Sequence, residues 1–232
     1  MEKINNILEL IKNLDSESSL KIISELEKEY VVFSTSLGYE DQVVSHIIFT
    51  NQLNIDVFTL DTGRLFNETY SVLNSTLQRY KTTIKVMYPQ TELVENLVTK
   101  KGPVSFYQSI ENRKECCYIR KVEPLKRALK NKTIWITGIR AEQSGNRENM
   151  PSAEWDEVNQ IIKFHPILNW TLDEVKNYIK IHNIPYNNLH DKGFVSIGCA
   201  PCTRAIKEGE DFRAGRWWWE DNIKKECGLH SS

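Results

Sequence analysis

The sequence predicts one α/β domain built on a mostly parallel, twisted sheet with helices on both faces. Short apolar runs typical of buried strands alternate with amphipathic segments of helical spacing. Parallel neighbouring strands need a crossover connection, and a helix is its usual form. The chain has 232 residues, which is enough for one complete hydrophobic core. No internal repeat or low-complexity linker divides it, so we expect a single domain over residues 1–232.

Helical spacing of apolar residues marks the first segment, 1–29. Residues 30–184 are expected to form the α/β core, and residues 185–232 an extended C-terminal segment rich in polar, glycine and aromatic residues. The expected strands are Tyr30–Ser34, Ile55–Asp61, Thr83–Tyr88 and Thr133–Thr137, with Ile161–Phe164 as a further one. The expected helices are Asp41–Leu53, Asn67–Tyr80, Thr91–Lys100, Ser109–Leu129 and Thr171–His182, the last opened by a capping box of Thr171 and Glu174.

Composition narrows the class of protein. Hydrophobic residues make up 40% and charged residues 26%, as in a globular protein in water. The net charge of −1 argues against a general nucleic-acid binder. The N-terminus lacks the apolar region of a secretory signal, and no stretch is long enough to span a bilayer. We therefore predict a cytoplasmic protein with no membrane partner, in which paired cysteines bind metal or react rather than form stable disulfides.

The five cysteines separate into four plus one. Cys116 and Cys117 are adjacent, and Cys199 and Cys202 form a C-x-x-C pair, so the four resemble a ligand set for zinc or an iron–sulfur cluster. Adjacent residues on a helix point about 100° apart. That spacing suits the separate iron corners of a 4Fe–4S cluster better than one small ion. Two alternatives stay open: Cys116 and Cys117 as buried apolar residues, and Cys199 with Cys202 as a redox pair.

Cys227 lies alone near the C-terminus, with Lys224, Lys225 and His230 close in sequence. Nearby positive charge lowers a thiol pKa and raises the fraction present as thiolate. This cysteine is therefore a candidate nucleophile. The alternative is an incidental terminal cysteine.

Three loops carry groups suited to an anion. The first, with Ser34 and Ser36, follows the first expected strand and leads into a helix, where hydroxyls, backbone N–H groups and the helix dipole favour negative charge. Its alternative is an ordinary strand–helix turn capped by Asp41. The loop lacks the Gly-Lys-Ser/Thr ending of a Walker A sequence, which excludes that motif.

The second loop, Asp61-Thr62-Gly63, ends the second expected strand and could contact a ribose or an adenine amino group, or be a plain turn. The third, residues 138–147, carries Arg140 and Arg147, whose planar guanidinium groups suit phosphate and sulfate. Singly, such arginines are most often surface residues. Further along, Arg213 and Arg216 lie in a basic stretch next to a tryptophan triplet, residues 217–219. The triplet suits core packing first, and base stacking or protein docking as alternatives.

The combination of segments resembles the assimilatory adenylyl-sulfate (APS) and phosphoadenylyl-sulfate (PAPS) reductases. The matching segments are LDTGRLFNET, CCYIRKVEPL, TGIRAEQSGNR, GCAPCTRAIKEGEDFRAGRWWWE and KECGLH. The resemblance implies an adenine nucleotide alpha hydrolase-like (PP-loop-like) fold. It also implies one 4Fe–4S cluster per chain on the four paired cysteines, and APS as the substrate of this cysteine-bearing branch.

The same resemblance implies a two-step reaction. The Cys227 thiolate attacks the sulfur of the sulfate group and expels AMP, and thioredoxin then releases sulfite from the S-sulfonate. Arg140, Arg147, Arg213 and Arg216 hold the phosphosulfate, and Lys121 lies between cluster and substrate. The cluster acts electrostatically and structurally, because two-electron thiol chemistry takes no electron from iron. The sequence is compatible with a homo-oligomer.

Three rival functions remain at this point. The first is the same chemistry on PAPS. The second is an ATP pyrophosphatase or adenylyltransferase, which needs a Gly-Gly loop where this chain has Ser34-Thr-Ser-Leu-Gly38. The third is a zinc-stabilised module that binds single-stranded nucleic acid through the basic stretch and the tryptophan triplet.

Overall fold

The computed structural model describes residues 2–26, 30–143 and 150–220. These residues form two compact units. The first, here called the sheet unit, contains residues 1–59, 71–85 and 129–187. The second, the cysteine unit, contains residues 60–70, 86–128 and 188–232. The single-domain organisation expected from the sequence stays a prediction.

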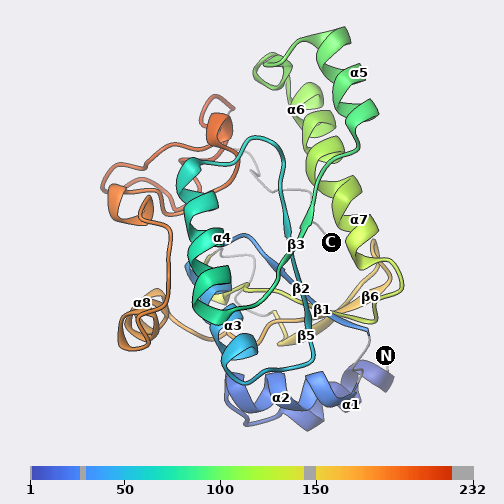
Figure 1. The fold of residues 1–232 in the computed structure, drawn as a ribbon, viewed down its shortest axis with the longest axis vertical. Helices are drawn as coiled ribbons and strands as arrows, with labels where there is room; N and C mark the ends of the chain where they lie inside the picture. The colour runs from blue at the N-terminus through green and yellow to red at the C-terminus, as the bar shows by residue number, and fades with distance from the viewer. Residues whose placement is uncertain (1, 27–29, 144–149, 221–232) are drawn as a thin grey trace. The chain divides into compact units, whose positions relative to one another are not determined.

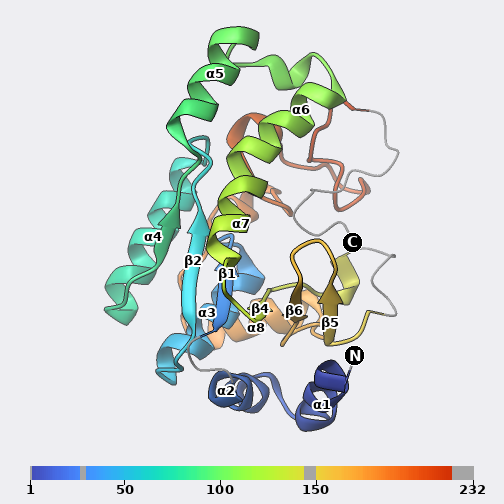
Figure 2. The ribbon, with the colours of Figure 1, turned by 90° about the vertical axis from the view of Figure 1, so that its right-hand side faces the viewer.

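Among the described residues there is one six-stranded sheet, with the strand order β3-β2-β1-β4-β6-β5 (Figures 1 and 2). Strand β1 pairs in parallel with β2 and β4, β4 pairs in parallel with β6, and β5 is antiparallel to β6. The mostly parallel α/β class is therefore confirmed. The strands are β1 (Val31–Thr35), β2 (Asp56–Leu60), β3 (Lys85–Met87), β4 (Ile134–Ile136), β5 (Ala153–Asp156) and β6 (Ile161–Phe164).

The helices follow the expected order. They are α1 (Glu2–Ile11), α2 (Ser16–Leu26), α3 (Tyr39–Thr50), α4 (Asn67–Tyr80), α5 (Thr91–Lys101), α6 (Ile110–Cys117), α7 (Glu123–Leu129) and α8 (Leu172–Ile181). The expected capping box of α8 is present, because the Thr171 hydroxyl accepts the Glu174 N–H and the Glu174 carboxylate accepts the Thr171 N–H. None of the described helices is both long and apolar enough to cross a membrane.

Alternate strand residues build the core of the sheet unit. Val31 and Phe33 of β1, Ile134 and Ile136 of β4, and Phe164 of β6 are at most 1% exposed and belong to one apolar cluster. Successive side chains of a strand point to opposite faces, so these residues define one buried face. Apolar residues of α1, α2, α3 and α8 join the same cluster. Helices α1 and α2 lie side by side (Figures 1 and 2).

Two features of the sheet unit differ from the expectation. Strand β5 was not expected, because its four residues, AEWD, give no clear alternation. Residue Asp41 does not cap α3: the N-cap is Gly38, without a side-chain hydrogen bond, and Asp41 turns back to Ser36 instead.

The cysteine unit has its own small core. Leu97, Phe106, Ile119 and Trp217 pack with three of the cysteines. Trp217 is 1% exposed, so core packing is confirmed for this tryptophan. Helix α6 runs on into α7 through a π-helical turn, Tyr118–Val122, and the three form a continuous helical rod (Figures 1 and 2).

Candidate functional site

The loop after β1, residues 34–38, is here called the anion loop. It lies at the carboxyl end of β1, where ligands of open α/β sheets bind. Its N–H groups already have acceptors within the loop region: Ser36 N–H donates to Asp41 Oδ2 at 2.5 Å, and Leu37 N–H donates to Thr35 Oγ1 at 3.0 Å. The Ser36 hydroxyl also donates to Asp41 Oδ2, at 2.6 Å. Asp41 thus fixes the shape of the loop.

Asp41 lies against Gly138, the second residue after the end of β4. A Cβ on Gly138 would come within 2.1 Å of Asp41 Oδ1 and 3.1 Å of its backbone nitrogen. Burial raises the pKa of Asp41 to about 6, against the opposing hydrogen bonds from Ser36. A residue without a Cβ is therefore required beside this buried carboxyl group. Two of the three expected loops meet at this contact.

Ser36 donates its hydroxyl hydrogen to Asp41, whereas the Ser34 hydroxyl accepts a hydrogen bond. Trp135 Nε1 donates to Ser34 Oγ at 2.8 Å, and an indole N–H is a donor only. The Ser34 hydroxyl is thus an acceptor in this bond and keeps its own hydrogen for another partner. Lys163 lies directly opposite Trp135 on β6, and its Nζ lies 5.2 Å from the centre of the indole ring. The same Nζ lies 2.9 Å from Asp156 Oδ2.

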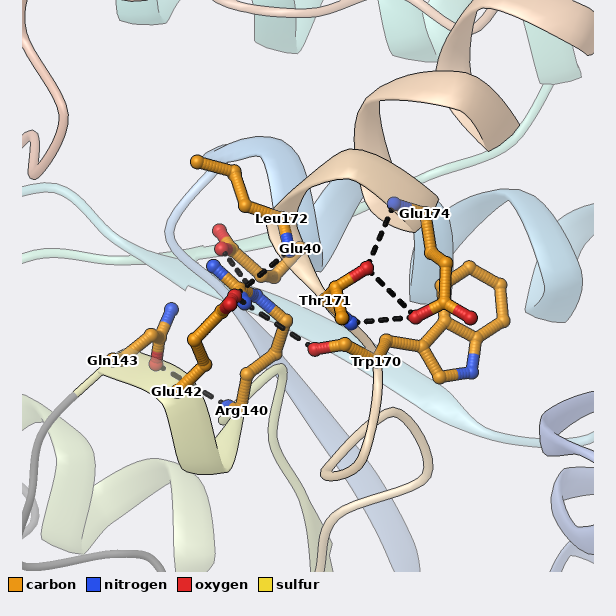
Figure 3. Close-up of polar contacts among 8 residues, drawn as sticks. All are labelled: Glu40, Arg140, Glu142, Gln143, Trp170, Thr171, Leu172 and Glu174. Carbon is orange, nitrogen blue, oxygen red and sulfur yellow. Dashed lines mark hydrogen bonds and ion pairs between the residues drawn. The ribbon is translucent and has the colours of Figure 1, made fainter.

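Arg140 is 1% exposed and lies between two carboxylates (Figure 3). Its Nε donates to Glu40 Oε1 at 2.9 Å and its Nη1 to Glu142 Oε2 at 2.6 Å. The guanidinium group is therefore paired within the protein rather than presented to solvent. Its expected role as a ligand of the phosphosulfate stays a prediction.

Replacing Gly138 by alanine should destabilise the sheet unit and distort the anion loop. The added methyl group meets a buried carboxylate and backbone, so we expect the free energy of unfolding to fall by about 1–3 kcal/mol. Urea unfolding measures this change. Gly38→Ala is the matched control, because its Cβ meets only Ser36 Oγ at 3.4 Å and its φ of −78° suits any residue. Equal stability of the two variants would refute the close contact with Asp41.

The cysteine unit holds a second set of candidate site residues. Cys116, Cys117, Cys199 and Cys202 all line one small pocket. Among the described residues, no three histidine, cysteine, aspartate or glutamate side chains are placed to hold a single metal ion. The four cysteines line one shared pocket instead, and a cluster with a separate iron for each cysteine needs its ligands gathered in this way.

The C-x-x-C segment is fixed by backbone hydrogen bonds on every side. Residues Ala200–Cys202 form a 3₁₀ turn, closed by Cys202 N–H to Cys199 O at 2.9 Å. Ala200 N–H donates to Arg64 O at 2.8 Å, and Trp217 N–H donates to Cys202 O at 3.2 Å. The strand-then-helix context of a thioredoxin-type redox pair is not the one found here.

The π-helical turn sets the positions of the cations beside the adjacent cysteines. π-turns inside helices are uncommon and often occur at functional sites. Arg120 and Lys121 lie in this turn and line the cavity, as do Arg64 and Arg113. Arg113 is paired with Glu220 at 2.6 Å, so Arg64, Arg120 and Lys121 provide the positive charge beside the thiols.

The thiols influence each other's ionisation. Burial, followed by the charges of Cys199 and Cys117, raises the pKa of Cys202 to about 12. Burial also opposes ionisation of Cys199, but Lys121, the Thr62 hydroxyl and Arg216 outweigh it and hold the pKa of that thiol below its ordinary value. Burial and neighbouring thiolates thus oppose ionisation of Cys202, whereas nearby cations favour ionisation of Cys199.

Two buried guanidinium nitrogens support an anionic group in the same unit. The Nε atoms of Arg120 and Arg216 have no hydrogen-bond partner among the described residues. Arg216 is 6% exposed and lies under Gly198, where a Cβ would come within 2.3 Å of its Nη2. A buried N–H group that lacks an acceptor is costly, so these two nitrogens favour an acceptor beside them. The donor set and its surroundings therefore fit a 4Fe–4S cluster carried by thiolates.

The loop Asp61-Thr62-Gly63 also belongs to the cysteine unit. Asp61 accepts the Gly63 N–H at 2.7 Å and the Tyr70 hydroxyl at 3.0 Å, and Gly63 has a φ of +70° that favours glycine. The Thr62 hydroxyl lies 3.3 Å from Cys199 Sγ, and the Thr62 carbonyl accepts Arg120 Nη1 at 2.6 Å. Thr62 therefore contacts one of the four paired cysteines, in addition to its place in the loop expected to bind the nucleotide.

The expected site residues fall into three groups. Ser34, Ser36 and Arg140 lie in the sheet unit. The cysteine unit holds Asp61, Thr62, Gly63, Lys121, Arg213, Arg216 and the two cysteine pairs. Arg147 and Cys227 lie outside the described residues.

Sequence reasoning missed several functional side chains. Arg113 and Arg120 were not singled out, although each lies three residues from a cysteine along one helical segment, a spacing that places side chains on the same face. Of the two carboxylate partners of Arg140, Glu142 is two residues away in sequence, whereas Glu40 is 100 residues away and gave no such signal.

A mostly parallel sheet whose first strand leads through a hydroxyl-rich turn into a helix defines a PP-loop-like α/β protein. Residues 30–205 match the phosphoadenosine phosphosulfate reductase domain. The chain belongs to the phosphoadenosine phosphosulfate reductase family.

Relatives of the chain include two adenosine 5'-phosphosulfate reductases. The Allochromatium vinosum protein is 47% identical over 215 residues, which cover 92% of this chain and 84% of that protein. The protein of Neisseria meningitidis serogroup A is 49% identical over 199 residues, covering 85% of this chain and 82% of that protein.

Solved structures support the same fold. The phosphoadenylyl-sulfate reductase from Candida auris, a phosphate complex, matches with a TM-score of 0.74 and 26% identity over 89% of this chain and 97% of that one. The FMN adenylyltransferase of Candida glabrata matches with a TM-score of 0.53 at 17% identity, which shows a shared fold alone.

Proposed function

We propose that this protein is an oxidoreductase that reduces adenosine 5'-phosphosulfate to sulfite and AMP, with thioredoxin as the reductant, in sulfate assimilation and cysteine biosynthesis. The observation that carries the proposal is the gathering of Cys116, Cys117, Cys199 and Cys202 around one cavity. The relatives that are 47–49% identical bear the name of APS reductase, which supports APS over PAPS. Free thiols suit the reducing cytoplasm, where we place the protein.

The reaction begins at Cys227. Its thiolate attacks the sulfur of the sulfate group, the bond from that sulfur to the phosphate oxygen breaks, and AMP leaves with the electron pair. The enzyme then carries an S-sulfonate on Cys227. A thioredoxin thiolate attacks the Cys227 sulfur and releases sulfite, leaving a mixed disulfide. The second thioredoxin thiol closes the thioredoxin disulfide and restores Cys227, so the two electrons come from thioredoxin.

The arginines and the anion loop bind and orient the substrate in this proposal. Ser34 donates its remaining hydrogen to an oxygen of the phosphosulfate, while Ser36 and Asp41 fix the loop. Arg213, Arg216 and Arg147 offset the charge of the phosphosulfate as the thiolate approaches. Asp61, Thr62 and Gly63 form the turn that receives the nucleoside.

One 4Fe–4S cluster is the proposed cofactor, held by the two cysteine pairs. When bound, it provides a fixed charge and ties α6 to the C-x-x-C turn. Arg120 and Lys121, three and four residues after Cys117, stabilise the negative charge of the four thiolates and place positive charge where the sulfate is expected.

Trp135→Phe tests the proposed donor role of Ser34. Loss of the indole N–H leaves the Ser34 hydroxyl free to rotate, so we expect the KM for APS to rise about threefold, the effect of one ordinary hydrogen bond. Trp155→Phe, on the partly exposed edge strand β5, is the control and should leave KM unchanged. An unchanged KM in Trp135→Phe would remove Ser34 from the substrate contacts.

The proposal as a whole is tested by side-by-side turnover of APS and PAPS with reduced thioredoxin. We expect sulfite and AMP in equal amounts from APS, and slower release of sulfite from PAPS. Faster turnover of PAPS would reassign the substrate. Release of pyrophosphate from ATP would replace the proposal by an adenylyltransferase reaction.

A further inference from the structure

Arg140 joins three separate segments of the sheet unit (Figure 3). Glu40 lies in the first turn of α3, and Glu142 lies in the 3₁₀ turn Ala141–Gln143. The carbonyl of Trp170, just before α8, also accepts Arg140 Nη1 at 3.3 Å. The guanidinium group is thus the common partner of a helix start, a turn and the entry to a second helix.

Glu142 extends this connection to the first residue of α8. The oxygen that accepts Arg140 Nη1, Oε2, also accepts the Leu172 N–H at 2.9 Å. The N-terminal N–H groups of a helix have no partner within the helix, so this bond anchors α8 to the turn. The capping box of Thr171 and Glu174 is a neighbouring but separate network in Figure 3.

The charge around Arg140 is unfavourable for direct binding of an anion. One guanidinium group faces two carboxylates, Glu40 and Glu142, so the group of three carries one net negative charge. The Arg140 side chain is 2% exposed. A phosphate or sulfate would have to displace a buried ion pair, and breaking such a pair leaves an uncompensated charge.

Glu40 and Arg140 are also close in sequence to the residues that fix the anion loop. Glu40 precedes Asp41, and Arg140 lies two residues after Gly138, whose missing Cβ makes room for the Asp41 carboxylate. Asp41 in turn holds the N–H and hydroxyl of Ser36. The start of α3 and the segment after β4 are therefore joined at two places. One is the contact of Asp41 with Gly138, and the other is the ion pair of Glu40 with Arg140.

We propose that Arg140 is a positioning residue that fixes the anion loop through Glu40 and Glu142 and does not touch the substrate. This inference rests on the proposed function for the identity of the anion. It assigns Arg140 a role different from the phosphosulfate ligand that the sequence predicts. The two roles give opposite results when a carboxylate partner is removed.

The test is a double-mutant cycle of Arg140→Gln and Glu142→Gln, with KM and kcat for APS and the affinity for AMP as readouts. A positioning role predicts that each single change raises KM by about tenfold with a smaller effect on kcat, and that the double variant is no worse than either. Glu142 has a side chain that is 56% exposed, so Glu142→Gln is expected to fold even where Arg140→Gln does not.

Glu174→Gln is the matched control. It weakens the capping box at the same end of α8 without touching Arg140, so it should lower the thermal midpoint and leave KM unchanged. A raised KM in this control as well would reduce the effect to general loss of helix stability and overturn the proposal.

A direct ligand role would show the opposite sign for the glutamate. Removing Glu142 would then free Arg140, and KM for APS would fall or stay constant while Arg140→Gln raised it. That result would overturn the positioning role. If wild-type protein releases no sulfite from APS, the proposed function fails by itself, and the same cycle on AMP affinity still decides the role of Arg140.

Discussion

Serine in place of Cys202 should yield protein without a complete iron–sulfur cluster and without reductase activity. A serine hydroxyl is not ionised at neutral pH and replaces one of the four thiolates that line the cavity. Backbone hydrogen bonds from Trp217 and to Cys199 hold this residue in place, so the change affects the donor atom more than the turn. Wild-type protein purified without oxygen should contain about four iron and four sulfide per chain.

Iron and sulfide analysis with visible absorbance measures this effect, and we expect both to fall by more than half in Cys202→Ser. Thr203→Ser is the control, because it changes the adjacent residue and keeps the hydroxyl that donates to the Cys199 carbonyl. Full iron content in Cys202→Ser would rule out this residue as a ligand. Stoichiometric zinc in the wild-type protein would replace the cluster by a zinc site.

Serine in place of Cys227 should abolish sulfite release while the colour of the cluster stays intact. The hydroxyl of serine is a far weaker nucleophile than a thiolate, so the first step of the proposed reaction cannot proceed. We expect activity to fall by at least about a thousandfold, with iron content unchanged. The pair of variants separates two roles: Cys202→Ser loses colour and activity together, and Cys227→Ser loses activity alone.

Residual turnover in Cys227→Ser would point to another nucleophile. Cys117 is the obvious candidate among the described residues, since it is more exposed than the other three. Trapping an S-sulfonate on Cys117 in that variant would contradict the division of the cysteines into four ligands and one nucleophile.

Local patterns in the sequence predicted most elements of the fold. Apolar runs identified β1, β2, β4 and β6, and the Thr171–Glu174 spacing identified the start of α8. These features depend only on residues within four positions of one another, so they can be recognised in the sequence alone. Strand β5 was missed because its four residues carry no alternation. It is recognised as a strand by its pairing with β6.

The site was predicted less completely, because its contacts join distant segments. The cysteine pairs were visible as spacings, but the π-helical turn that follows Cys117 has no sequence signal. Asp41 looked like a helix cap, and only the fold shows that it instead holds Ser36 and abuts Gly138. Arg140 looked like an anion ligand because its pairing with Glu40 depends on how α3 packs against the segment that carries Arg140.

The mass of the intact protein after exposure to APS tests the central claim most directly. Wild-type protein with its cluster is incubated with APS in the absence of thioredoxin, and the modified residue is located by peptide mapping. The account predicts a gain of one sulfonate group, on Cys227, that reduced thioredoxin removes as sulfite. A protein that stays unmodified, or that is modified only at a cluster cysteine, would contradict it.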